Sequence, residues 1–162
     1  MKSSGSDVFY RTTSDKTILQ AVDKDIALIL GKQKGTPSTF NASSAIIITF
    51  DNIQSLGLSS VLFKYQTVIA TDFKNTFAIV DYERLDGDGI EIGFYEVYCK
   101  HLKRFTGSSE SKQLVDDTNV GIPGKQVHLL TNNDNRCSNP EGTFISVFYF
   151  LYIFPSRHTT LQ

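Results

Sequence analysis

The sequence predicts an α+β, mainly β domain, with an antiparallel sheet or sandwich and one early helix packed on it. Three observations lead to this prediction. Apolar or alternating runs of strand length recur along the chain, and only one stretch has helical spacing. The 162 residues include 12 Phe and 7 Tyr but no Trp, an aromatic content that favours strands. A length of 162 residues with 40% hydrophobic and 20% charged residues suits one globular domain.

The first two elements are a strand and the only helix. Residues 6–13 alternate in polarity and predict a strand. Residues 15–29 predict a helix, with Ser14 as its N-cap and Asp15 favourably placed in its first turn. The apolar residues that recur at helical spacing, and should therefore be buried, are Ile18, Val22, Ile26 and Ile29.

The middle of the chain predicts strands joined by polar turns. Residues 45–50 form a continuous apolar run, typical of a strand covered on both faces, and residues 52–60 read as a loop. Residues 61–71 and 76–82 should pair as a hairpin. Asp72 lies at the elbow between them, with no His or second acid nearby in the sequence. We therefore interpret Asp72 as a turn residue rather than a catalytic carboxylate.

The rest of the chain alternates between strand and loop signals. "LDGDG" predicts a turn, residues 90–99 a strand, residues 100–118 a polar stretch, and residues 126–131 a short strand. The apolar tail run is 11 residues long, from Phe144 to Phe154, and is too short to cross a bilayer as a helix. We expect the tail to pair as a strand on an edge of the domain.

The sequence contains no recognisable catalytic, cofactor-binding or metal-binding motif. Asp86 and Asp88 do not follow the spacing of an EF-hand loop, so their turn predicts no calcium site. The three histidines, His101, His128 and His158, have no metal-ligand spacing. The interpretation is therefore that the protein is not an enzyme and needs no cofactor.

Four residues form the best candidate for a partner surface: Lys100, His101, Lys103 and Arg104. Clustered cations favour a sulfated glycan or an acidic protein, although a short basic run can also be ordinary solvated surface. The net charge of −1 argues against nucleic acid as a partner.

Cysteine and glycosylation signals leave the compartment open. Cys99 and Cys137 can form one disulfide or stay free, and their spacing decides neither. Asn41 begins the N-glycosylation sequon "NAS", which is modified only in the secretory pathway. The N-terminal residues contain no signal-peptide pattern.

The stretch "YQTVIATDFKNTFAIVDY" resembles the signature of the NIDO domain, the extracellular module shared by nidogen, alpha-tectorin, membrane mucins and sushi-domain proteins. Three further blocks, "DVFYRTTSDKTILQAV", "FNASSAIIITFDNI" and "TNVGIPGKQ", are similar to family blocks in the same order. The family's initial Trp-Ala-Asp-Val-Asp stretch is absent, and Gln126 stands where the family has Trp. The resemblance implies an N-terminally incomplete NIDO-type domain over residues 1–131, with residues 132–162 outside it. The signature positions matched are Gln66, Ala70, Thr71, Asp72, Phe77, Ile79 and Tyr82.

The resemblance implies a non-catalytic extracellular module for cell–matrix adhesion or matrix organisation, within a larger mosaic protein. Its partners would be extracellular matrix or cell-surface proteins or glycans. Two alternatives stay open. One is a small hydrolase-like enzyme that uses the Asp-rich turns, and the other is a truncated product with no independent function.

Overall fold

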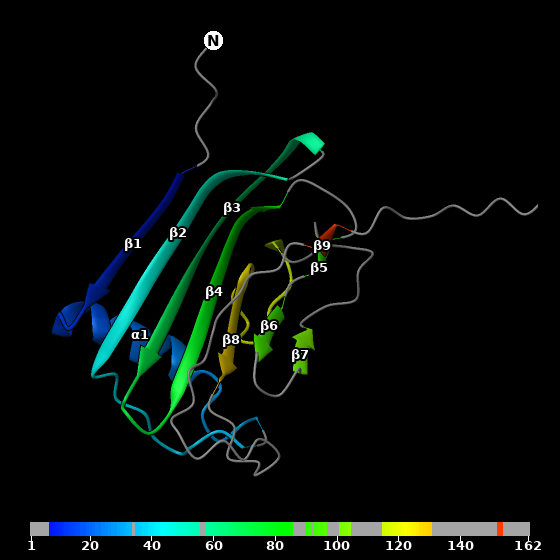
Figure 1. The fold of residues 1–162 in the computed structure, drawn as a ribbon. Coiled ribbons are helices and arrows are strands. Elements are labelled where there is room, and N and C mark those ends of the chain that lie inside the picture. Colours follow the sequence, from blue (N-terminus) through cyan, green and yellow to red (C-terminus); the bar gives the residue numbers. More distant parts are fainter. Residues whose placement is uncertain are drawn as a thin grey trace, which may run out of the picture.

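The computed structural model describes residues 7–33, 35–55, 58–85, 90–91, 93–96, 101–104, 115–130 and 152–153. One antiparallel sheet of five strands, in the order β1-β2-β3-β4-β8, dominates the fold (Figure 1). A single helix is present in these residues, and the predicted fold class is confirmed. The elements are β1 (Asp7–Thr13), α1 (Lys16–Ala27), β2 (Ser44–Ser55), β3 (Leu58–Thr71), β4 (Thr76–Leu85) and β8 (Lys125–Leu129).

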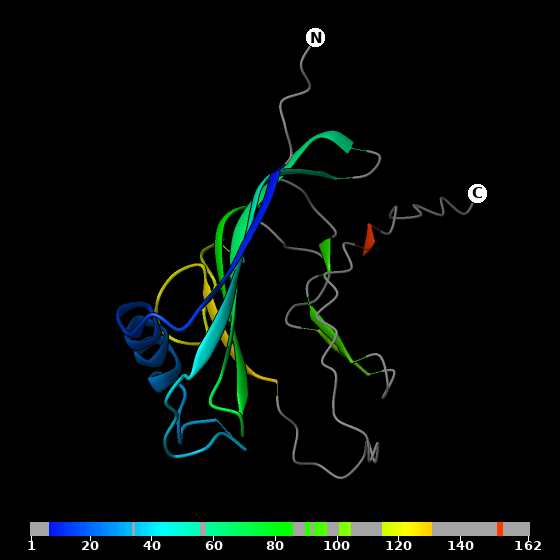
Figure 2. The ribbon, with the colours of Figure 1, turned by 60° about the vertical axis from the view of Figure 1, so that its left-hand side comes forward.

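Two small sheets lie on the other side of the main sheet from α1 (Figure 2). In one, β5 (Ile90–Glu91) pairs with β9 (Tyr152–Ile153), and in the other, β6 (Gly93–Glu96) pairs with β7 (His101–Arg104). The two described tail residues pair as a strand with β5, in a two-stranded sheet separate from the five-stranded one.

The helix forms where its spacing predicts, but a different residue caps it. Asp15 is the N-cap, and its carboxylate accepts hydrogen bonds from the backbone N–H groups of Thr17 and Ile18. The prediction of Ser14 as the cap was one residue too early. Asp15 has the extended backbone conformation of a cap, and its carboxylate also complements the positive end of the helix dipole.

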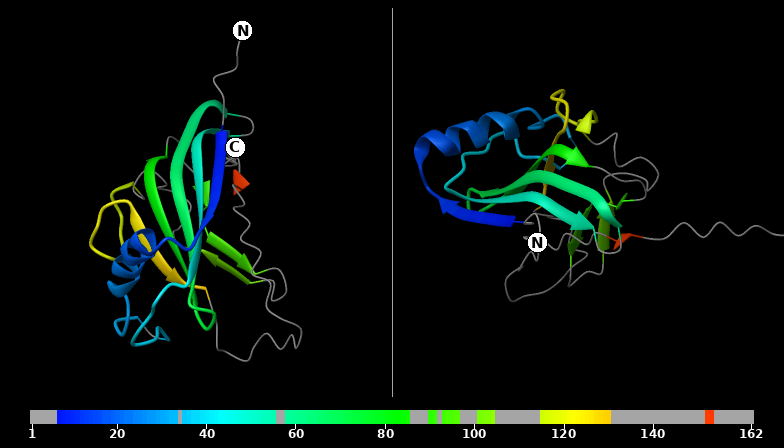
Figure 3. Two further views of the ribbon diagram at one scale, coloured as in Figure 1. Left: turned by 90° about the vertical axis from the view of Figure 1, so that its left-hand side faces the viewer. Right: turned by 90° about the horizontal axis from the view of Figure 1, so that it is seen from above.

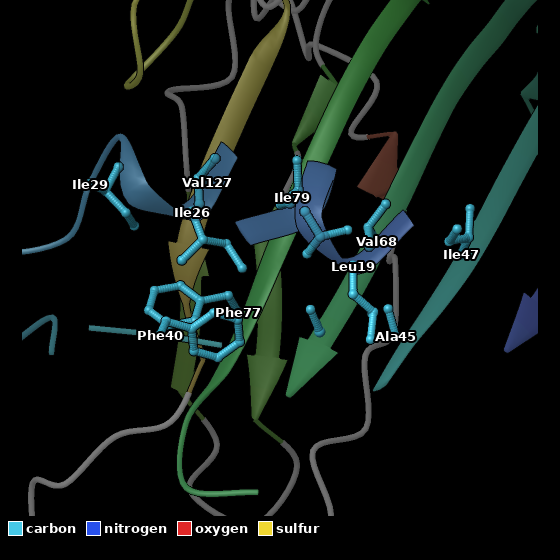
Figure 4. Close-up of a cluster of buried hydrophobic side chains, with 12 residues drawn as sticks. Leu19, Ile26, Ile29, Phe40, Ala45, Ile47, Val68, Phe77, Ile79 and Val127 are labelled. Atoms are coloured by element: carbon cyan, nitrogen blue, oxygen red, sulfur yellow. The ribbon is translucent and has the colours of Figure 1, made fainter. Parts of the chain in front are cut away.

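One hydrophobic core lies between α1 and the sheet (Figure 4). Val22 and Ile26 are buried as predicted, whereas Ile18 is only half-buried and Leu19 is buried in addition. Phe40, from the segment after the helix, meets Phe77 edge to face, with ring centroids 4.8 Å apart. The sheet contributes alternate residues from four strands: Ala45, Ile47, Val68, Ala70, Phe77, Ile79 and Val127.

A second core covers the opposite face of the same strands. Its buried residues are Phe63, Tyr65, Ala78, Val80, Tyr82 and Leu85. Phe50 stacks on the ring of Tyr65, with centroids 4.4 Å apart. Because both faces of β4 are covered, its buried positions run consecutively from Phe77 to Val80.

Two stretches that the sequence suggested to be irregular contain strand residues. The predicted loop over residues 52–60 was wrong, since β2 continues to Ser55 and β3 begins at Leu58. The pairing of β2 with β3 continues through register shifts, and Asn52 has a φ of 52°. A bulge thus lets polar residues extend the strands. The polar stretch over residues 100–118 likewise contains β7, which pairs with β6.

Candidate functional site

The elbow at Asp72 is a turn between two antiparallel strands, as the sequence predicts. One carboxylate oxygen of Asp72 accepts hydrogen bonds from the backbone N–H groups of Lys74 (2.8 Å) and Asn75 (2.6 Å). The Asp72 N–H in turn donates to the Asn75 carbonyl. Phe73 has a φ of 67°, so the turn includes a left-handed residue. The side chain of Asp72 therefore holds the reversal of β3 into β4.

The electrostatics of Asp72 agree with this structural role. Its partial burial raises the pKa of the carboxyl, but the hydrogen bonds from Asn75 and Lys74 outweigh that effect and leave the pKa below its ordinary value. A carboxyl that works as a general acid or base near neutral pH needs the opposite shift. Within the described ranges, no three His, Cys, Asp or Glu residues group as metal ligands.

The "TNVGIPG" bend supports the end of the sheet beside β8. The side chain of Asn119 pairs with the backbone of Val127 like a neighbouring strand. Its amide donates to the Val127 carbonyl (2.6 Å), and its oxygen accepts from the Val127 N–H (2.9 Å). Gly124 follows with a φ of +73°, and its carbonyl accepts a hydrogen bond from the N–H of Tyr82. The bend is thus bonded to both β8 and β4.

A row of polar residues crosses the sheet on the same face as α1. Thr49, Gln66, Asp81 and Lys125 follow one another in register on β2, β3, β4 and β8. Antiparallel partners share a face, so this row lies next to the buried apolar row that begins at Ile47. Seen from above, the strands form a curved layer with α1 along one side (Figure 3). The Gln66 side-chain amide donates to the Thr49 hydroxyl at 2.8 Å.

Lys125 joins this row to the helix. Its ammonium lies 2.5 Å from a carboxylate oxygen of Asp25, on α1, and 3.4 Å from one of Asp81. Burial lowers the pKa of Lys125, but the hydrogen bond to Asp25 and the charge of Asp81 raise it above its usual value. Burial raises the pKa of Asp81, and the nearby negative charge of Asp25 adds to this effect, so that the pKa stays above its ordinary value although Lys125 lowers it. One lysine therefore balances two carboxylates.

Lys64 extends the charged surface toward the end of the strands. Its ammonium pairs with Glu83 at 2.9 Å and approaches Asp51 at 4.0 Å. The Glu83 hydrogen bond and charge raise the pKa of the exposed Lys64. These groups and the row together form a surface that we call the polar half of the sheet: Thr49, Asp51, Lys64, Gln66, Asp81, Glu83 and Lys125.

A scan against protein-family models matches residues 1–132 to the nidogen-like domain, NIDO. The chain belongs to the NIDO domain family. NIDO domains are non-catalytic modules of larger extracellular mosaic proteins. Comparisons with curated proteins and with solved structures gave no match.

The NIDO signature residues of this chain hold the hairpin together. Ala70, Phe77 and Ile79 are buried in the core beside α1, and Tyr82 is buried in the second core. The Thr71 hydroxyl donates to the carbonyl of Asn75, beside the Asp72 turn. The signature therefore specifies a structural hairpin, and among its matched positions Gln66 is the one that belongs to the polar half of the sheet.

The predicted site residues are distributed over separate parts of the NIDO chain. Lys100, Cys99 and Cys137 lie outside the described residues. His101, Lys103 and Arg104 lie on the four-residue strand β7, which pairs with β6.

Asn41 is exposed in the segment between α1 and β2. Phe40 is buried on one side of it, and on the other side the Ala42 N–H donates to Asp23 on α1. The sequon is thus held at the surface of the domain.

Sequence reasoning missed the polar half of the sheet. The sequence did contain a sign of this surface, because Gln66 and Asp81 are polar residues within strands that are otherwise largely apolar. Their meeting with Lys125 depends on β8 lying next to β4, which spacing along the chain does not reveal. No helix among the described residues is long and apolar enough to cross a membrane.

Proposed function

We propose that this NIDO domain is a non-catalytic binding module that serves cell–matrix adhesion or matrix organisation within a larger extracellular protein. The observation that carries the proposal is the polar half of the sheet. It is a half-exposed, charged surface spread over four strands rather than a cluster of acids and bases in one place. Surfaces of this kind recognise other macromolecules through many shallow polar contacts.

Charge indicates the kind of protein partner that this surface would accept. Among the described residues, its ion pairs contain the four acids Asp25, Asp51, Asp81 and Glu83 and the two lysines Lys64 and Lys125. The acidic excess favours a partner segment with Lys or Arg side chains, because complementary potentials speed association and exclude partners of like charge. We therefore propose a basic segment of a matrix or cell-surface protein as the partner of the polar half.

The basic run on and before β7 is proposed as a separate contact for sulfated glycans. His101, Lys103 and Arg104 fall within four consecutive residues, and Lys100 precedes them. A sulfated glycan and a basic protein segment would then bind different surfaces of one module. The two contacts can be separated by substitution.

The test measures attachment of cells, and binding of solubilised matrix proteins, to the immobilised chain. Glu83 is largely exposed at the polar half, so Glu83→Lys reverses the charge at this position and removes the acidic excess of the surface while leaving the cores intact. We expect the substitution to reduce binding several-fold. Asp116→Lys makes the same charge change at an exposed residue on the loop before β8, and it should leave binding unchanged.

Two outcomes would contradict the proposal. One is an immobilised wild-type chain that retains neither cells nor matrix proteins. The other is equal loss with Glu83→Lys and Asp116→Lys, which would indicate a response to net charge rather than recognition by this surface.

A further inference from the structure

The edge strand β1 exposes an unusual amount of apolar surface. Among the described strands β1 pairs only with β2, so its other edge has no neighbour there. Its first six residues are all exposed. Val8, Phe9 and Tyr10 expose 53%, 58% and 79% of their surface. Exposed apolar edges of this kind usually mark an interaction site, since an unprotected edge recruits other strands.

The charges on β1 are arranged symmetrically about Phe9. Asp7 lies two residues before Phe9, and Arg11 lies two residues after it. Asp7 and Arg11 are four residue steps of extended strand apart, about 13 Å, so the two charges cannot pair within one chain. Neither residue forms an ion pair with another of the described residues, and both are exposed.

We propose that β1 pairs with the β1 strand of a second copy of this chain, antiparallel and centred on Phe9. In that register, Asp7 of each copy lies opposite Arg11 of the other, and Val8 lies opposite Tyr10. The twofold axis makes each of these pairs occur twice. The sequence "DVFYR" is thus complementary to itself in charge and in side-chain type.

Each cross-strand pair in this register is a favourable one. Opposite charges and aromatic–β-branched pairs stabilise neighbouring strands, whereas like charges directly opposite destabilise them. The two Phe9 rings meet at the axis, where aromatic pairs add to the burial of apolar area. Backbone groups along the outer edge of β1, which face solvent among the described residues, gain strand partners at the same time. A second copy therefore satisfies the apolar, charged and backbone groups of this edge together.

The dimer also extends the polar half of the sheet. Phe9 pairs with Thr49, which begins the polar row on β2. Residues opposite each other in antiparallel strands share a face, so both copies present α1 and the polar row on the same side. The two polar rows then lie in line on one side of the joined sheet, with the pair of Phe9 rings between them. A partner with two binding segments would gain affinity through multivalency.

Charge reversal tests the register with the full chain in solution. Sedimentation velocity over roughly 5–500 µM covers the range in which small interfaces associate. We expect the wild-type chain to form dimers in that range. Asp7→Arg places Arg opposite Arg at two positions, and Arg11→Asp places Asp opposite Asp. Each variant alone should self-associate about tenfold more weakly or not at all.

The mixture of the two variants gives the decisive result. A chain carrying Asp7→Arg and a chain carrying Arg11→Asp are complementary at both positions, so they should form a heterodimer with about wild-type affinity. The double variant Asp7→Arg/Arg11→Asp should again form homodimers.

Matched controls are Asp116→Arg and Lys32→Asp, which make similar charge changes at exposed residues away from β1 and should dimerise as the wild type does. A monomeric wild type at every concentration would overturn the proposal. So would a dimer that both single variants leave unchanged, because it would use another surface. Both positions are exposed, so we expect each variant to keep its fold. Circular dichroism and thermal melting check this for each variant.

Discussion

The side chains of Asp25 and Lys125 join the helix to the edge of the sheet although 100 positions separate them in the sequence. Asp25 lies near the end of α1, and Lys125 begins β8. The same ammonium contacts Asp81 on β4, so one side chain bonds to the helix and to the neighbouring strand. The contact therefore links α1 to the sheet at the position where the apolar core ends and the polar half of the sheet begins.

Replacing Lys125 should weaken the fold. Lys125→Met keeps the side-chain length but leaves Asp25 and Asp81 without their shared cation, and only 16% of the Lys125 side chain is exposed. We expect the free energy of unfolding, measured by urea denaturation near pH 7, to fall by about 1–3 kcal/mol. The control is Lys24→Met, at an exposed position of α1 next to Asp25. It should change the free energy of unfolding by less than about 0.5 kcal/mol. Equal stability of the two variants would show that the contact adds nothing.

The Asp72 turn predicts a stability effect that depends on pH. Asp72→Ala removes the acceptor of two backbone hydrogen bonds and should cost about 1–2 kcal/mol, whereas Asp72→Asn keeps one oxygen and should cost less. Because the folded state lowers the pKa of Asp72, its charge stabilises the fold above the unfolded pKa of about 3.9. That contribution is lost as the pH falls through the folded pKa. The difference in melting temperature between the wild type and Asp72→Asn should therefore become smaller below about pH 4. A difference that stays the same at every pH would contradict this account.

Gly124 and Gly121 form a matched pair for testing the bend before β8. Both have positive φ, but a Cβ at Gly124 would lie 2.7 Å from the carbonyl oxygen of Tyr82, whereas a Cβ at Gly121 would meet nothing within 4 Å. Gly121→Ala should cost about 1 kcal/mol from backbone strain alone. Gly124→Ala should cost roughly 2–4 kcal/mol, since the backbone of β4 cannot move away easily. Chemical denaturation distinguishes the two, and an equal loss would mean that the close approach to Tyr82 carries no penalty.

The basic run predicts retention on a heparin column. Replacing Lys100, Lys103 and Arg104 with Ala should lower the salt concentration needed for elution, because the attraction is electrostatic and screened by salt. The control replaces three exposed lysines in and just after α1, Lys16, Lys24 and Lys32, and alters the net charge equally. A similar drop for both triple variants would identify general charge attraction, and absence of retention in the wild type would leave the run as solvated surface.

The exposed sequon predicts glycosylation when the chain passes through the secretory pathway. Expressed behind an added signal peptide in animal cells, the chain should lose apparent mass on treatment with an N-glycosidase. Asn41→Gln and Ser43→Ala should abolish the shift, while Ser44→Ala, one residue beyond the sequon, should keep it. A wild-type chain that is secreted without any glycan on Asn41 would contradict the prediction.

Local patterns in the sequence determined the elements whose causes are local. Helical spacing located α1, because an isolated amphipathic period of 3.6 has few other interpretations. The elbow at Asp72 followed from turn chemistry that depends on neighbours within three residues. The cap shifted from Ser14 to Asp15 because two adjacent residues had suitable side chains, and only the backbone conformation distinguishes between them.

Only the tertiary structure showed which strands are neighbours. The candidate site depends on these neighbours, because its residues come from different strands. The place of β8 beside β4 follows from burial of both faces of β4, a property of the whole core and not of either strand. Only that placement brings Lys125 to Asp81 and Asp25, and only the position of β1 at the edge leaves Phe9 and Tyr10 exposed. The sequence by itself determined the family signature, the helix and the hairpin. Long-range packing determines the order of the strands and brings polar residues that are distant in the sequence onto one surface. The periodicity of a strand shows which side chains share a face, but it does not show which strands lie beside it.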